Sequence, residues 1–225
     1  MDSDSPAETH VVQSLGHRGD GVCAGPLYAP LTLPGETVRG VRDGERLRAV
    51  VVLDPSPARA APACPHFGRC GGCALQHADD GFLAEWKTDA IRAALAARGL
   101  SAPLRPIAVS PPGSRRRVAL SGRRTRKGAI VGFHGRAEAA LVPIETCAVA
   151  APAIVAALPA LRELAGLVAS RSGEARLAVT RAETGLDVAA EGQRPLDGAL
   201  RAALAALARR ADFARLGYGG EVIAT

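Results

Sequence analysis

Three of the chain's five cysteines lie within ten residues, in the stretch CPHFGRCGGC from Cys64 to Cys73. Their spacing is C-x5-C-x2-C, and a fourth thiol, Cys147, lies far downstream. Three thiolates in one loop with one remote thiolate are typical of an iron–sulfur cluster. A zinc ion, usually held by paired C-x2-C knuckles, and a redox dithiol are the alternatives that this spacing leaves open.

The residues around the thiols favour the cluster. Gly71 and Gly72 separate the last two clustered cysteines, and a glycine lets the main chain pass close to inorganic sulfide. His66 and His77 could replace a thiol in a zinc site, but we expect both to be ordinary loop histidines. Cys23 stands apart in a glycine-rich region and is not expected to bind the same group.

An odd number of cysteines in a chain without an export signal indicates a reducing compartment. The first ten residues, MDSDSPAETH, contain no apolar segment of the kind a signal peptide needs. No run of 18 or more apolar residues is present, so we expect no membrane span. The sequence therefore predicts a cytoplasmic protein that does not act at a membrane.

The first third of the chain has the pattern of a small β domain. Residues 11–53 consist of short apolar runs separated by glycines, which predicts hairpins that close into a barrel. Residues 54–63, DPSPARAAPA, form a linker. Beyond the thiols, apolar positions spaced by three and four predict a helix that begins at Asp79 or Asp80 and stops near Gly99.

The remaining residues predict alternating strands and helices. Residues 115–147 have the pattern of a three-stranded meander, and a helical stretch follows with a kink or restart at Pro159. A β-hairpin is expected about Glu183–Gly185, then an amphipathic helix over 196–212. The last residues begin a strand and then stop, so we expect a truncated chain.

The positive charge is concentrated rather than spread. The formal net charge is +6, and no Asp or Glu occurs between Ala90 and Ala137. Such a segment suits RNA phosphates, although a solvated basic surface is the alternative. Phe133 and His134 are possible base-stacking residues, and Phe133 is expected in the core. The predicted RNA-binding residues are Arg115, Arg116, Arg117, Arg123, Arg124, Arg126 and Lys127, with His17 and Arg18 as weaker candidates in a glycine-rich turn.

Several segments together resemble a known family. SLGHRGDGV, LPGETV, DPSPARAAPACPHFGRCGGCALQH, the helix start EWK and GFHGRAEAALVPIETCAVAAPAI are similar to segments of the class I RNA uracil-5-methyltransferases. That family includes the bacterial ribosomal-RNA m5U methyltransferases and their tRNA relatives. The resemblance is specific around the cysteines and weak after about residue 175.

The resemblance implies an α+β fold in which a small OB-like β-barrel, a TRAM domain, precedes an iron–sulfur-binding α+β central domain. A Rossmann-like methyltransferase domain is then expected to be absent from this chain. The implied organisation is a disordered tail over 1–10, the barrel over 11–57, the central domain over 58–217 and the start of a further, truncated segment over 218–225. The implied [4Fe–4S] ligands are Cys64, Cys70, Cys73 and Cys147.

The same resemblance implies the RNA-binding and cluster-binding portion of an S-adenosylmethionine-dependent RNA uracil-C5 methyltransferase. The substrate would be rRNA or tRNA, and the protein is expected to be monomeric. S-adenosylmethionine is expected only on the missing domain, because LGYGGE (216–221) lacks a strand–glycine loop–helix context. No catalytic residue is expected in this chain, which would be inactive alone. The alternatives are a stand-alone iron–sulfur RNA-binding module and a zinc-binding structural protein.

Overall fold

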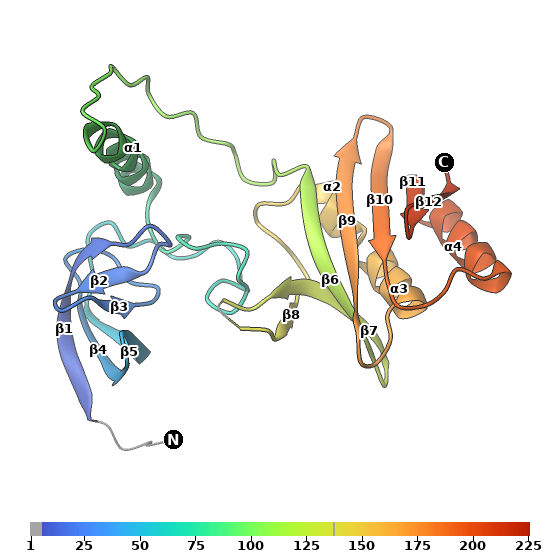
Figure 1. Cartoon of the computed structure of the whole chain (residues 1–225), viewed down its shortest axis with the longest axis horizontal. Coiled ribbons are helices and arrows are strands. Elements are labelled where there is room, and N and C mark those ends of the chain that lie inside the picture. Colours follow the sequence, from blue (N-terminus) through green and yellow to red (C-terminus); the bar gives the residue numbers. More distant parts are fainter. Residues whose placement is uncertain (1–5, 137) are drawn as a thin grey trace. The chain divides into compact units, whose positions relative to one another are not determined.

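The computed structural model describes residues 6–136 and 138–225 (Figure 1). The chain divides into two compact units, each with its own hydrophobic core. The first unit runs as far as Gly68 and resumes over Cys73–Val109, and the second contains Arg69–Gly72 and Ser110–Thr225. Within the described ranges, no helix combines the length and the apolar character that a membrane crossing requires.

The first unit contains a closed five-stranded barrel with the strand order β1-β2-β3-β5-β4. Alternation along the strands places Val12, Leu27 and Val38 in its interior, each at most 1% exposed. The tight turn from β4 to β5 contains Gly44, whose φ of 59° is a conformation that favours glycine. The strands are β1 (Ala7–Leu15), β2 (Gly21–Cys23), β3 (Leu27–Ala29), β4 (Thr37–Asp43) and β5 (Arg46–Asp54).

Strand β1 begins within the range predicted to be a disordered tail. Of the predicted tail, residues 1–5 lie outside the described residues, whereas Ala7–His10 already pair with β4. The apolar and β-branched residues of this stretch extend the barrel edge by four positions. The strand therefore starts before the expected boundary at residue 11.

A buried ion pair fastens the segment that follows the barrel. The side chain of Glu36 is fully buried and accepts hydrogen bonds from the N–H groups of Leu33 (2.9 Å) and Ser56 (3.2 Å). Arg59 donates to the same carboxylate through Nε (2.5 Å) and Nη2 (2.7 Å). Burial alone would raise the pKa of Glu36, but the hydrogen bonds from Arg59, Leu33 and Ser56 outweigh it and hold the pKa below its ordinary value.

Helix α1 (Asp80–Ala96) begins where the sequence predicts. The carboxylate of Asp79 caps it by accepting the N–H of Phe82 at 2.8 Å, and Gly99, with a φ of 67°, follows its end. The predicted apolar face is only partly covered: no residue of the helix is buried, and Ile91 is 50% exposed.

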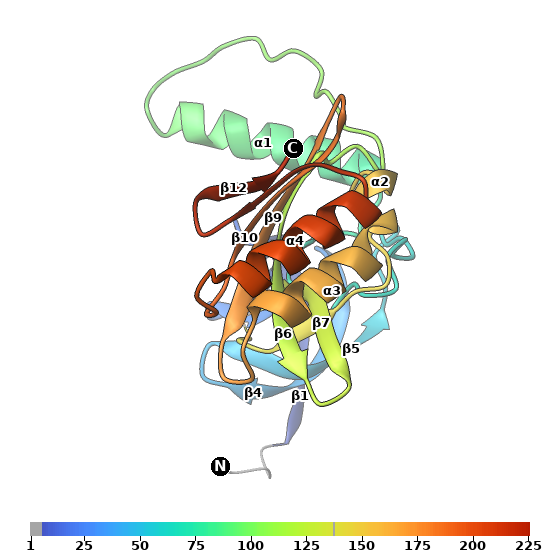
Figure 2. The same cartoon turned by 90° about the vertical axis from the view of Figure 1, so that its right-hand side faces the viewer.

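The second unit is built on a seven-stranded sheet with the order β12-β11-β10-β9-β6-β7-β8. All neighbouring strands are antiparallel except β10 and β11, which are parallel. Helices α3 and α4 lie side by side over one face of the sheet (Figure 2). The strands are β6 (Arg117–Thr125), β7 (Gly128–His134), β8 (Leu141–Pro143), β9 (Glu174–Ala182), β10 (Gly185–Glu191), β11 (Phe213–Tyr218) and β12 (Glu221–Ala224).

The helices of this unit supply much of its core. In α3 (Leu158–Val168), Leu161, Leu164 and Val168 are 0% exposed, and burial of one such side chain contributes about 1.5–3 kcal/mol. Pro159 lies at the start of α3, so the predicted restart is confirmed. The other two helices are α2 (Pro152–Ala156) and α4 (Gly198–Arg210).

The end of the chain belongs to the same sheet. Strand β12 pairs with β11 through a turn at Gly219 and Gly220, whose φ values are 58° and 88°. The prediction that a further segment opens at residue 218 therefore does not match the structure. The glycines of LGYGGE form a hairpin turn, because two consecutive positive φ angles suit that geometry.

Candidate nucleic-acid interface

Three consecutive arginines lie at one end of strand β6, and their main chain is held from both sides. Arg115 donates its N–H to Val149 and accepts from Ala151, both over 2.9 Å. On the other side, Arg181 of β9 donates its N–H to the carbonyl oxygen of Arg116 over 2.7 Å. The backbone hydrogen bonds of this segment are thus made within the protein. The side chains of all three arginines are exposed to solvent.

These arginines line an open groove of about 580 Å³. Strand pairing sets Arg117 opposite Thr180, which adds a hydroxyl group and brings in Arg181. The lining thus contains four guanidinium groups and no carboxylate. Such a surface attracts phosphate groups, which guanidinium can bind with two parallel hydrogen bonds. We call this the arginine groove, and its lining residues are Arg115, Arg116, Arg117, Thr180 and Arg181.

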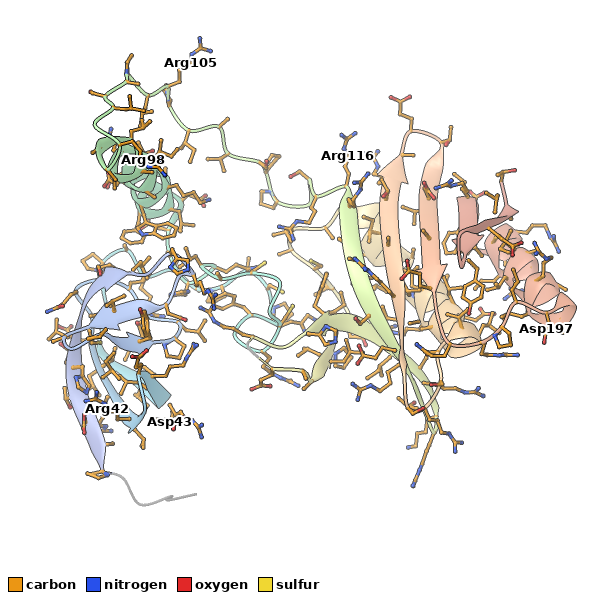
Figure 3. All side chains as sticks on the ribbon, viewed as in Figure 1. Arg42, Asp43, Arg98, Arg105, Arg116 and Asp197 are labelled. Atoms are coloured by element: carbon orange, nitrogen blue, oxygen red, sulfur yellow. The ribbon has the colours of Figure 1, made fainter. Side chains whose placement is uncertain are left out.

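The remaining basic candidates of the second unit lie at the opposite end of β6. Arg116 is near the start of this strand, and the β6–β7 turn is at its far end (Figure 3). A nine-residue strand separates them by roughly 27 Å, at about 3.4 Å per residue. The basic residues expected on one face of the hairpin therefore form two separate clusters, one at each end of β6. Arg124, Arg126 and Lys127 are exposed in the second one.

Arg123 is less available than its neighbours. It donates to Glu174 over 2.6 Å, and His134 lies 2.9 Å from the other oxygen of the same carboxylate. The hydrogen bond from Arg123 is the main reason why the pKa of Glu174 is lowered. Burial opposes this effect, and a smaller contribution from His134 adds to the lowering. Phe133 packs against the core, as expected.

The two basic candidates of the barrel, His17 and Arg18, line a smaller pocket of about 230 Å³. Its other lining residues are Gly16, Asp20, Tyr28 and Arg46. Neither Tyr28 nor Arg46 was predicted from the sequence, because neither belongs to a charge run or a motif. Their proximity to His17 follows from the barrel pairing of β3 with β5.

The four cysteines predicted to bind a cluster form no disulfide and are partly buried. In the described residues, 6–136 and 138–225, no group of three or more His, Cys, Asp or Glu side chains is arranged to hold a metal ion. Thiolates are the donors that an iron–sulfur cluster requires, so the chemistry of these four side chains fits such a group. The predicted ligands Cys64, Cys70, Cys73 and Cys147 remain a hypothesis based on spacing.

The segment 69–72 pairs with the end of β7. Gly71 donates its N–H to the carbonyl oxygen of His134 over 2.9 Å, and Cys70 bridges to Gly135. A Cβ atom on Gly71 would lie 2.8 Å from that same oxygen, so only glycine fits. The N–H of Gly72 points to the sulfur of Cys70 at 3.4 Å, an arrangement that stabilises a thiolate.

The other candidate ligands and nucleophiles have structural surroundings. His77 is 1% exposed, its ring centroid lies 5.5 Å from that of Phe67, and its Nε2 is 3.5 Å from the carbonyl oxygen of Thr32. Cys23 is 2% exposed within the barrel core, and burial raises the pKa of its thiol. A buried thiol of raised pKa is a poor nucleophile.

Comparison with known proteins identifies relatives of this chain. No protein-family model matches the chain. An uncharacterized RNA methyltransferase of Brucella suis is 42% identical over 94% of this chain and 52% of its own length. One from Caulobacter vibrioides is 44% identical over 94% of this chain and 54% of its own length.

Over most of its own length the chain is thus similar to bacterial proteins named RNA methyltransferases. A more distant relative, the 23S rRNA (uracil(1939)-C(5))-methyltransferase of Dechloromonas aromatica, is 36% identical over 75% of this chain and 42% of its own length. The chain spans about half the length of the curated relatives it matches.

A solved structure resembles this chain in fold. It is the Pyrococcus abyssi tRNA (uracil-54, C5)-methyltransferase in complex with S-adenosyl-L-homocysteine, with a TM-score of 0.67 and 20% identity. The match covers 95% of this chain and 54% of the Pyrococcus chain. At this identity the likeness concerns the fold.

This likeness corrects the predicted fold class. We predicted an α+β chain with a TRAM barrel and a cluster-binding domain, from which the Rossmann-like methyltransferase domain is absent. The match to a methyltransferase structure covers 95% of this chain, so the prediction that a methyltransferase fold is absent from it was wrong. The closed five-stranded barrel expected at the start of the chain is present. LGYGGE, which lacked the sequence context of a cofactor loop, is the β11–β12 turn.

Two expectations depended on the missing domain and lose that basis: the assignment of S-adenosylmethionine only to a domain outside this chain, and the inactivity of the chain alone. The bound S-adenosyl-L-homocysteine belongs to the Pyrococcus protein, of which this chain covers 54%.

Proposed function

We propose that this chain is the RNA-contacting part of an S-adenosylmethionine-dependent RNA uracil-C5 methyltransferase. The observation that carries the proposal is the arginine groove, in which four guanidinium groups meet without a carboxylate among the lining residues. The names of the relatives supply the reaction class, and a uracil-C5 methyltransferase with the same fold supports the choice of base.

The chemistry of uracil methylation defines what the RNA-contacting residues must do. A thiolate adds to carbon 6 of the uracil, and carbon 5 takes the methyl group from the sulfonium of S-adenosylmethionine. A general base then removes the carbon-5 proton, and the thiolate is eliminated from carbon 6. This sequence requires one uridine to be held in a fixed place. Residues that grip the flanking phosphates fix the RNA without reading its sequence, and this is the role we assign to the arginine groove.

Salt bridges distinguish the groove from the other basic residues. Arg123 is engaged with Glu174, and Arg46 with Asp20 over 3.1 Å, so their charges are partly compensated within the protein. The guanidinium groups of Arg115, Arg116 and Arg117 are exposed and lie together. We therefore expect the groove to contribute more to RNA affinity than Arg123 does.

We further propose that Cys64, Cys70, Cys73 and Cys147 bind a [4Fe–4S] cluster. The C-x5-C-x2-C spacing and the glycine-only position at Gly71 support this set, and none of the four cysteines is in a disulfide. A cluster held by four thiolates has no open coordination position, so its contribution would be to stabilise the fold around the RNA-contacting residues. Free thiols also support a reducing, cytoplasmic location, and we propose that the protein is a monomer.

The direct test is nucleoside analysis of RNA from cells that lack the gene encoding this chain. We expect 5-methyluridine to disappear from one position of rRNA or tRNA, which mass spectrometry of purified RNA identifies together with the substrate class. The wild-type gene should restore it. A variant carrying Arg115→Gln, Arg116→Gln and Arg117→Gln should restore much less.

A matched control carries Arg171→Gln and Arg209→Gln, two exposed arginines that do not line the groove. It should restore the modification as the wild-type gene does. Unchanged 5-methyluridine in all RNA after deletion of the gene would rule out the proposed reaction. Retained RNA binding with no loss of modification would instead favour an RNA-binding module without catalysis.

A further inference from the structure

We infer that the barrel pocket lined by Gly16, Asp20, Tyr28 and Arg46 binds one unpaired base of single-stranded RNA. The inference rests on the proposed function, since it supposes that the ligand is RNA. It assigns a second contact, of a different chemical kind, to a unit that does not contain the arginine groove.

The pocket is built by a tight turn packed against two strands. The N–H of Gly16 donates to Asp20, and that of Gly19 donates to Gly16, each over 2.8 Å. Tyr28 of β3 bridges to Arg46 of β5, and its N–H donates to Glu45 over 2.8 Å. Backbone hydrogen bonds thus hold the turn and the two strands in place before any ligand arrives, which lowers the entropic cost of binding.

The lining combines groups that a base needs and a bare phosphate does not. Tyr28 is half-buried and offers an aromatic ring for stacking, the main way in which unpaired bases are held. The carboxylate of Asp20, 10% exposed, can accept a hydrogen bond from a base N–H and would repel an isolated anion. Arg46 holds this carboxylate over 3.1 Å and leaves nearly half of its own side chain exposed.

The size of the pocket suits one ring system. Its volume of about 230 Å³ lies below the ~300–1,000 Å³ of sites for drug-sized molecules. His17 and Arg18 are exposed at its edge, where they can contact the phosphates on either side of a bound base. In this arrangement His17 and Arg18 contact the RNA backbone next to the bound base and do not contact the base itself.

Gly16 keeps the pocket open. A Cβ atom there would lie 3.7 Å from Cε1 of Tyr28 and 3.5 Å from the carbonyl oxygen of Asp20. These are ordinary contact distances, so a larger side chain can be accommodated by the fold but would occupy space beside the ring. Gly16→Val therefore fills the site without removing any of its polar groups.

The test compares two ligands of equal charge: a fluorescently labelled oligouridine and an abasic ribose-phosphate oligomer of the same length. Fluorescence anisotropy with the full chain gives the affinity ratio between them. Because stacking on one aromatic residue contributes about 1–3 kcal/mol per base, we expect the chain to prefer oligouridine by at least about fivefold. Tyr28→Ala and Gly16→Val should abolish this preference, and Tyr28→Phe, which keeps the ring, should retain it.

An unchanged preference in both Tyr28→Ala and Gly16→Val would overturn the inference, as would equal binding of the two oligomers by the wild-type chain. Failure of the proposed function has a different signature. In that case neither oligomer binds, or the triple glutamine variant of Arg115–Arg117 binds both as tightly as the wild-type chain does. Unfolding curves of Tyr28→Phe and Gly16→Val identify any loss that comes from misfolding.

Discussion

The main-chain N–H of Arg181 donates to the carbonyl oxygen of Arg116 over 2.7 Å. This bond continues the pairing of β6 with β9 past the last residues of the β6 ladder. It joins Arg181 of β9 to the run of three arginines at the start of β6. The arginine groove thus depends on a pairing between segments far apart in the sequence.

Glu36→Gln is expected to destabilise the barrel strongly. The substitution leaves the half-buried guanidinium of Arg59 without its charged partner and weakens the bonds from Leu33 and Ser56. Breaking a buried ion pair in this way costs about 3–5 kcal/mol. Urea unfolding of the chain at pH 7 measures the loss. Glu45→Gln, at an exposed position, should change the free energy of unfolding by less than about 0.5 kcal/mol, and an equal effect of both variants would contradict the role of Glu36.

The ion pair of Glu174 with Arg123 predicts a pH dependence of stability. The pKa of Glu174 is lowered in the folded chain, chiefly by the hydrogen bond from Arg123. Its contribution is therefore complete above the ordinary glutamate pKa of about 4.3 and is lost as the pH falls through the folded-state value. The partner is 43% exposed, so solvent screening limits the contribution to about 0.5 kcal/mol at pH 7.

We expect Glu174→Gln to lower the free energy of unfolding at pH 7 and to have a progressively smaller effect below pH 4. Denaturant titrations at several pH values provide the comparison, with Glu183→Gln in the exposed β9–β10 turn as the control. If the difference in free energy of unfolding between wild type and Glu174→Gln grew on acidification, the expected direction of the pH dependence would be contradicted.

Gly71→Ala should disrupt the backbone pairing of residues 69–72 with the end of β7. The new Cβ atom would meet carbonyl oxygens of His134 at 2.8 Å and Gly135 at 2.9 Å, so the backbone must move. Overpacking of this kind costs about 1–3 kcal/mol, measurable by urea unfolding. Gly198→Ala meets no atom within 4 Å at the start of α4 and should be neutral or stabilising by up to about 1 kcal/mol. Equal stabilities of the two variants would contradict the close approach.

Cys73→Ser should remove the proposed cluster. After anaerobic purification, we expect the wild-type chain to contain iron and sulfide and to absorb visible light, and the variant to lose all three. Cys23→Ala should retain them, because Cys23 lies in the barrel core. Stoichiometric zinc in the wild-type chain, without iron, would contradict the proposed cluster and support a zinc site instead.

Local signals were sufficient to predict much of the secondary structure. The cap at Asp79, the restart at Pro159 and the hairpin about Glu183–Gly185 all depend on neighbouring residues, and the structure confirms each. The rejection of LGYGGE as a cofactor loop also depended on local context, and the structure places Gly219 and Gly220 in the turn between β11 and β12.

The composition of the sites could not be obtained in this way. Arg181 joins the arginine groove only because β9 pairs with β6, and Tyr28 meets Arg46 only because the barrel closes. Strand order depends on which apolar faces pack together, and one chain's alternation does not specify it. The same reasoning placed Arg115–Lys127 on one hairpin face, although the strand's length divides these residues into two clusters.

The salt dependence of RNA binding tests the central claim most directly. The dissociation constant of a single-stranded RNA is measured by anisotropy at several KCl concentrations for wild type, the triple glutamine variant of Arg115–Arg117, Arg181→Gln and the control Arg209→Gln. Each phosphate contact contributes about 0.7 to the slope of log affinity against log salt, so the triple variant should flatten the slope by roughly 2 and Arg181→Gln by about 0.7. Arg209→Gln should leave it unchanged. Equal slopes for the wild-type chain and the triple variant would contradict the assignment of the arginine groove to RNA.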